Sequence, residues 1–135
     1  MSTSARSFDY AVTVDEAWDV TSDRGSVVLR GADEEFWAPE HLVLAALARC
    51  SLTSLRYHCR RAEISVTSSA AARGTVTRRE ADGRFAFVEI AVEADVVFDP
   101  KPDGAAVEDL LMKAERDCFV GASLTAQPTY EWRVA

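Results

Sequence analysis

Three cysteines and one glutamate are the residues of this sequence that could carry out chemistry. Cys50 lies inside the apolar stretch PEHLVLAALARCSL, Cys59 follows nine residues later, and Cys118 follows Cys50 after 68 residues. Glu40 stands ten residues before Cys50. A thiolate is a nucleophile, and two thiols that meet can form a reversible disulfide. A cysteine in an apolar helix is also a common small core residue, so spacing alone leaves both roles open.

Helical geometry separates these residues. At about 100° per residue, nine positions place Cys59 on the opposite side of a helix from Cys50, which predicts that Cys59 takes no part in a shared site. Ten helical residues rise about 15 Å, so Glu40 and Cys50 of one chain cannot touch. If they cooperate, a second chain or an intermediary group must connect them. Glu40 is equally explained as an acid at the positive end of a helix dipole.

Composition limits the classes of partner. The chain has 135 residues, of which 48% are hydrophobic, and a formal charge of -7. Such a chain has room for one domain with a core, and its negative charge argues against nucleic acid or an anionic membrane surface as a partner. The N-terminal sequence MSTSARSFDY lacks the apolar run of a signal peptide, and no segment has the roughly 20 apolar residues of a membrane span. We therefore expect a cytoplasmic protein, whose reduced thiols are core residues or redox groups.

The hydrophobic pattern predicts strands that are grouped rather than alternating with helices, which indicates an α+β fold. A turn at Asp23 to Gly25 favours a hairpin, and Pro39 suits the first turn of a helix. The first half of that helix is apolar nearly all round, so we expect it to be buried. The turn sequence ADGR joins two later strands. We expect one domain over residues 1–135, with strands in 7–31, a central helix over about 39–60, a hairpin over 62–98, a helix over about 105–118 and a strand over 129–134.

Two motifs resemble a known family. The pattern P-E-x-L-x-x-A-A-x-x-x-C is matched by Pro39, Glu40, Leu42, Ala45, Ala46 and Cys50, and the pattern A-x-x-x-C by Ala114 to Cys118. Together with the order of elements, these motifs resemble the osmotically inducible protein C and organic hydroperoxide resistance (OsmC/Ohr) family over nearly the whole chain. The resemblance implies antiparallel sheets wrapped around a long central helix in an intertwined homodimer.

The same resemblance implies an activity. It is that of a peroxiredoxin-like oxidoreductase of the oxidative stress response, which reduces organic hydroperoxides with two cysteines and no cofactor or metal. It assigns the peroxidatic role to Cys50, the resolving role to Cys118 and an assisting role to Glu40. A sulfenic acid would form at Cys50, condense with Cys118 to a disulfide, and be reduced by an external dithiol, for which a lipoyl group is one candidate.

One part of the family pattern is missing. The family carries an arginine a few residues before a turn that reads VTSDRG here, but Asp15 stands near that position and no arginine occurs between Arg6 and Arg24. A buried thiol needs a neighbouring cation or strong donor to ionise near neutral pH. Arg24 and Arg30 are the nearest substitutes, because a guanidinium can hold both a carboxylate and a thiolate.

Other functions compete with the peroxidase. The missing arginine favours a dimer that keeps its cavity for a small apolar or thiol-reactive ligand and turns over little or no peroxide. A metal site would have to use His41, Cys50, His58 and Cys59, but Cys50 and Cys59 point oppositely and the metal-binding spacings C-x-x-C and H-x-x-x-H are absent. A cysteine hydrolase would need His41 as its base, and no acid is identified to orient it.

Overall fold

The computed structural model describes residues 6–14, 16, 20–27 and 37–135 of the chain. The chain divides into two units, Met1–His41 and Leu42–Ala135. Within the described residues, no helix combines the length and the apolar character that crossing a membrane requires.

The first unit contains a small antiparallel sheet in the order β1-β2-β3. Its strands are β1 (Val12–Val14), β2 (Val20–Ser22) and β3 (Gly25–Val27). The predicted hairpin is confirmed: Asp23 and Arg24 form the turn, and Gly25 has a φ of +136°, where side chains are disfavoured. Only Val12 to Val14 pair with β2, although the predicted strand region begins at residue 7.

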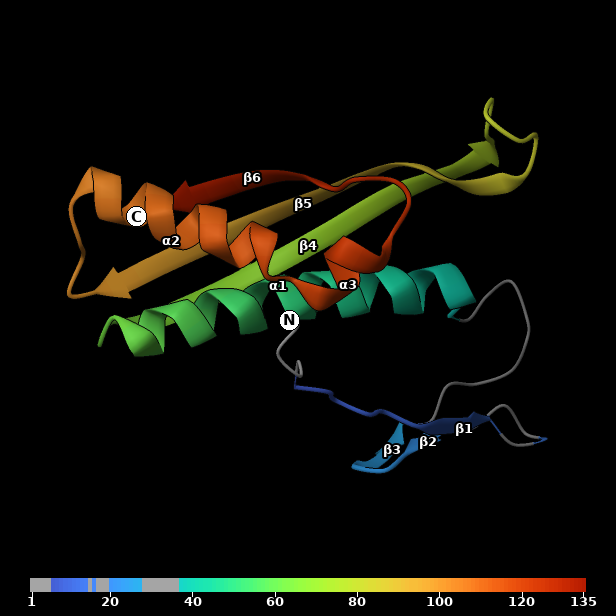
Figure 1. Cartoon of the computed structure of the whole chain (residues 1–135), viewed down its shortest axis with the longest axis horizontal. Coiled ribbons are helices and arrows are strands. Elements are labelled where there is room, and N and C mark those ends of the chain that lie inside the picture. Colours follow the sequence, from blue (N-terminus) through green and yellow to red (C-terminus); the bar gives the residue numbers. More distant parts are fainter. Residues whose placement is uncertain (1–5, 15, 17–19, 28–36) are drawn as a thin grey trace, which may run out of the picture. The chain divides into compact units, whose positions relative to one another are not determined.

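The second unit joins helices to a three-stranded sheet, a mixed α+β arrangement (Figure 1). The helix α1 starts at the predicted proline. In chain order the elements are α1 (Pro39–Arg61), β4 (Ser65–Arg78), β5 (Phe85–Asp99), α2 (Gly104–Arg116), α3 (Phe119–Ser123) and β6 (Thr129–Val134). The strands β4 and β5 form the long antiparallel hairpin expected around ADGR, whereas β6 runs parallel to β5. That parallel pairing needs a long crossover, which α2 and α3 provide.

A β-bulge in β5 explains a change of phase in its sequence pattern. Thr75 of β4 pairs with Glu89, whereas the next residue, Val76, pairs with Phe87, so Val88 is an extra residue in β5. Because a bulge adds one residue to the two-residue alternation, Phe87 and Ile90 pack into the same hydrophobic cluster.

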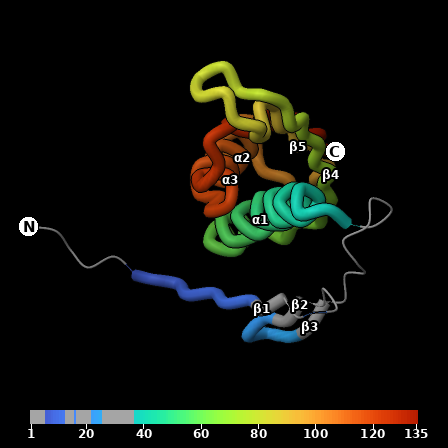
Figure 2. Tube along the Cα trace, turned by 90° about the vertical axis from the view of Figure 1, so that its right-hand side faces the viewer, coloured from blue at the N-terminus to red at the C-terminus, as the bar shows by residue number. Residues whose placement is uncertain are grey.

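Helices cover one face of the larger sheet, and the core lies between them (Figure 2). The inward face of β5 is buried at alternate residues: Ile90, Val92, Ala94, Val96 and Phe98. The core has two parts. In the first, here called the Cys59 cluster, the buried residues are Leu55, Cys59, Val96, Phe98, Val107, Leu110 and Ala114. In the second, called the Cys118 cluster, they are Leu47, Ile90, Val92 and Cys118.

The expectation that the first half of α1 is buried is wrong for the single chain. Leu47 is buried there, but Leu42, Ala45 and Ala46 are exposed. The sheet and the other helices of this unit pack against one side of α1. A helix that is apolar nearly all round therefore keeps a second apolar side uncovered.

Candidate active site

Cys118 lies at the start of one helix and not, as predicted, at the end of another. The sequence predicted a helix to residue 118, but α2 ends at Arg116, and Cys118 is the N-cap of α3 with φ -78° and ψ 108°. Its Sγ accepts a hydrogen bond from the backbone N–H of Gly121 at 3.4 Å. The side chain is fully buried. The short helix α3 therefore holds this thiol at a fixed position in the core.

Cys50 meets Cys118 although the two lie far apart in the sequence. Cys50 is partly buried on α1 and packs against the Cys118 cluster. Burial raises the pKa of the Cys50 thiol, and a hydrogen bond and charge interaction with Cys118 raise it further. The backbone amides of Val120 and Phe119 act in the opposite direction. The fold thus brings two reduced thiols together, and the raised pKa leaves Cys50 mostly protonated near neutral pH.

Within the second unit, Cys50 interacts with backbone N–H donors and not with a cationic side chain. The largest influences on the pKa of Cys50 are burial, the neighbouring thiol and two backbone amides, and no cationic side chain is among them. In that unit, therefore, the thiol lacks the ion pair that usually lowers a cysteine pKa.

Ser51 and Tyr130 surround the Cys118 thiol and were missed by sequence reasoning. The Ser51 hydroxyl lies 2.9 Å from the Tyr130 hydroxyl and 3.7 Å from Cys118 Sγ, and it donates to the carbonyl oxygen of Leu47 at 2.9 Å. Burial raises the pKa of Tyr130 to about 12, and the charge of Cys118 acts in the same direction. The only signals in the sequence were that Ser51 follows Cys50 directly and that Tyr130 lies in the strand predicted over 129–134.

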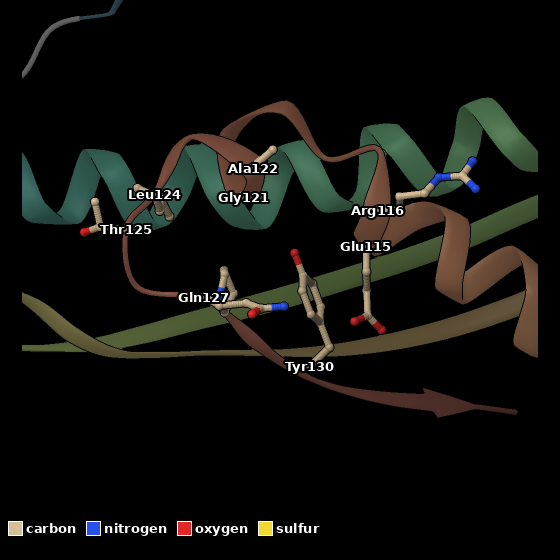
Figure 3. Close-up of a pocket in the computed structure, with 9 residues that line it drawn as sticks. Glu115, Arg116, Gly121, Ala122, Leu124, Thr125, Gln127 and Tyr130 are labelled. Carbon is tan, nitrogen blue, oxygen red and sulfur yellow. The ribbon is translucent and has the colours of Figure 1, made fainter.

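A cavity of about 410 Å³ lies beside these residues (Figure 3). Tyr130 and Gly121, which belong to the surroundings of Cys118, both line it, and the Tyr130 ring rises from β6 with its hydroxyl directed toward the helices. The remaining lining residues are Glu115, Arg116, Ala122, Leu124, Thr125, Gln127 and Pro128. Polar and apolar groups both face this space, so it can admit a small amphipathic molecule.

The other predicted site residues lie elsewhere. Cys59 is fully buried in the Cys59 cluster, on a different part of α1 from Cys50. Glu40 is exposed in the first turn of α1. Arg24 is exposed in the turn of the first unit, with its guanidinium 5.4 Å from the centre of the Tyr10 ring. Arg30 lies outside the described residues, as does Asp15.

The two histidines make other contacts. His58 Nε2 lies 2.8 Å from Asp117 Oδ2, and His41 Nδ1 accepts a hydrogen bond from the Ala38 N–H at 2.9 Å. Among the described residues, histidine, cysteine and acidic side chains nowhere gather in a group of three or more that could hold a metal ion.

Comparison with known proteins decides the family. The family model described as OsmC-like protein matches residues 31–133. The chain belongs to the OsmC-like protein family. This confirms the resemblance that the two cysteine motifs carried. No curated protein matches the chain.

Solved structures share the OsmC-like fold at low sequence identity. An OsmC-like protein of unknown function from Vibrio cholerae superposes with a TM-score of 0.78 at 16% identity, over 93% of this chain and 99% of that one. The organic hydroperoxide resistance protein OhrB of Bacillus subtilis has a TM-score of 0.64 at 20% identity, over 95% and 98%. An organic hydroperoxide resistance protein from Elizabethkingia anophelis has the same score and identity, over 99% of each chain. At these identities the likeness establishes the fold.

Proposed function

We propose that this protein is a thiol peroxidase that reduces organic hydroperoxides through a two-cysteine cycle. The observation that carries the proposal is the interaction between the Cys50 and Cys118 thiols, which are 68 residues apart in sequence. The third thiol, Cys59, is buried in the other part of the core.

The cycle uses these thiols in order. The Cys50 thiolate attacks the distal peroxide oxygen, the O–O bond breaks, and the alcohol leaves with a proton, so that Cys50 becomes a sulfenic acid. Cys118 then attacks the Cys50 sulfur, and water leaves as the disulfide forms. An external dithiol, for example of the lipoyl type, restores both thiols by exchange. Two of the structurally similar proteins are described as organic hydroperoxide resistance proteins, which supports this substrate class.

Activation of Cys50 is proposed to come from outside the second unit. Arg24 and Arg30 are the candidate cations, and Glu40 would orient the guanidinium, with the site completed in a homodimer. Replacement of each arginine by methionine tests this. Loss of the arginine that activates Cys50 should slow peroxide reduction roughly 10²-fold. If peroxide reduction is fast and neither replacement slows it, this account of activation fails.

The main test combines kinetics with thiol counting. Stopped-flow mixing with cumene hydroperoxide or hydrogen peroxide should show faster consumption of the organic peroxide, and one equivalent should remove two thiols per chain. Cys118→Ser should instead accumulate a sulfenic acid at Cys50, detectable by a dimedone adduct. Cys59→Ala serves as the control and should still lose two thiols. A Cys50 to Cys59 disulfide found by peptide mapping would contradict the assignment.

A ligand-binding function is the second candidate. The raised pKa of Cys50 favours little peroxide turnover, and the cavity beside Tyr130 could hold a small apolar or thiol-reactive molecule. Such a protein would consume little or no hydroperoxide, yet it would bind a maleimide or a fluorescent apolar probe in a fixed ratio to the number of chains.

A further inference from the structure

The environment of Cys118 contains polar groups that the two-cysteine cycle does not use. Ser51 and Cys118 are both fully buried, and the hydroxyls of Ser51 and Tyr130 lie next to the thiol. Buried polar groups are normally hydrogen-bonded, so the direction of each hydrogen can be worked out.

The single hydrogen of Ser51 determines the arrangement. A serine hydroxyl donates once and accepts twice. Because a carbonyl oxygen can only accept, the Ser51 hydrogen is donated to Leu47 at 2.9 Å. The Ser51 oxygen must then accept from both of its other neighbours, the Tyr130 hydroxyl at 2.9 Å and the Cys118 thiol at 3.7 Å.

These bonds fix the orientation of the Cys118 thiol. With its own hydrogen donated to Leu47, Ser51 is an acceptor for the thiol hydrogen, while the sulfur accepts from the Gly121 N–H at 3.4 Å and interacts with Cys50 and Tyr130. Burial raises the pKa of Tyr130 to about 12, so its hydroxyl stays protonated and remains a donor well above neutral pH.

We propose that Ser51 and Tyr130 control disulfide closure: Ser51 takes the hydrogen of the Cys118 thiol and holds its sulfur toward Cys50, and Tyr130 positions Ser51. The inference rests on the proposed two-cysteine cycle and concerns its second step. In that step the S–S bond forms, the S–O bond of the Cys50 sulfenic acid and the S–H bond of Cys118 break, and the hydroxyl and the hydrogen leave together as water. Ser51 contacts a reacting atom, and Tyr130, which is hydrogen-bonded to Ser51, also interacts with the Cys118 thiol.

Closure can be measured without any peroxide. Dithiodipyridine first reacts with the more accessible Cys50 and releases one thiopyridone; Cys118 then displaces the second thiopyridone and closes the disulfide. In a Cys59→Ala background these two phases report attack on Cys50 and closure by Cys118 separately.

Two variants remove the hydroxyls with little change in shape. Tyr130→Phe keeps the ring stacked on Trp132, with ring centroids 5.5 Å apart, and should slow the second phase roughly three- to tenfold. Ser51→Ala removes the hydrogen-bond acceptor of the Cys118 thiol and should slow the second phase roughly tenfold. The first phase should keep its rate in both variants, which a general loosening of the fold would not allow.

Matched control substitutions are available on α1, the helix that carries Ser51. Tyr57→Phe removes an exposed tyrosine hydroxyl, and Ser54→Ala removes a buried serine hydroxyl that has no hydrogen-bond partner among the described residues. Both controls should leave the second phase at the parent rate.

The outcomes separate this inference from the peroxidase proposal. Second phases that are unchanged in Ser51→Ala and Tyr130→Phe, or slowed equally with the first phase, overturn the inference. So does a parent protein that releases only one thiopyridone. A parent that closes, responds to both substitutions and yet ignores hydroperoxides supports the inference and overturns the peroxidase.

Discussion

The Cys50 thiol is less acidic than a catalytic thiol at neutral pH requires, at least from the groups of its own unit. Burial is the largest cause of its raised pKa, and the nearby Cys118 adds to it. The thiolate fraction falls about tenfold for each pH unit below the pKa. Reactivity at Cys50 should therefore follow pH closely.

Alkylation measures this directly. In the variant that lacks the activating arginine, we expect the rate of Cys50 modification by iodoacetamide to be slow at about pH 7 and to rise about tenfold per unit to above about pH 9, because the raised pKa delays ionisation. Mass spectrometry of the Cys50 peptide gives the rate for this thiol alone. A rate that is already constant between about pH 6 and pH 8 would mean that a cation lowers the pKa in solution.

At the level of elements, two fully buried leucines on α1 distinguish the site from the rest of the core. Leu47 belongs to the Cys118 cluster and its carbonyl holds Ser51, while Leu55 belongs to the Cys59 cluster. We expect Leu47→Ala and Leu55→Ala each to lower the free energy of unfolding by about 2–5 kcal/mol, measured in urea. Only Leu47→Ala should also slow disulfide closure. Equal slowing in both variants would show that closure reports overall stability.

Asp117 joins the end of α2 to α1. Its pKa is lowered to about 2, first by the Arg116 guanidinium and also by His58, whose Nε2 lies 2.8 Å away. A carboxyl group whose pKa is lowered in the folded protein stabilises the fold at pH values above its ordinary pKa of about 3.8. This stabilisation is lost as the pH falls toward about 2. Because Asp117 is partly exposed, the contribution is modest.

Acid unfolding tests this contact. Asp117→Asn cannot change its charge, so we expect the variant to lose less stability than the parent between about pH 4 and pH 2, and to be less stable than the parent at about pH 7. Urea unfolding followed by circular dichroism gives both values. Parallel pH profiles for the two proteins would contradict the role of Asp117.

Local sequence patterns predicted the positions of the helices and strands better than they predicted the contacts between them. Pro39, the ADGR turn and the alternation in β5 each act within a few residues, and the helix and hairpin follow from them. The five residues of α3 are too few to show a period, and alternation does not report that β6 runs parallel. The pairing of Cys50 with Cys118 needed the family motifs, and the Ser51 to Tyr130 contact joins residues that no motif connects.

At the scale of the whole molecule, the exposed apolar side of α1 is the feature that indicates a partner. Leu42 is 39% exposed and lies on the same helix half as the exposed Ala45 and Ala46. In the first unit Val12 and Trp37 are more than half exposed. Apolar surface of this kind marks an interaction site in many proteins. A second copy of the chain is the partner that the proposed shared site requires.

We therefore expect a homodimer whose interface includes the first half of α1. Light scattering should give twice the chain mass of 14.8 kDa at micromolar concentration. Leu42→Lys places a charge on this apolar side and should shift the protein toward monomer and, if the site is shared, abolish peroxide turnover. Val97→Lys changes a 51% exposed valine on the outer face of β5 and should leave both properties intact. A folded parent that stays monomeric, or a monomeric Leu42→Lys variant with full turnover, would show that one chain holds the complete site.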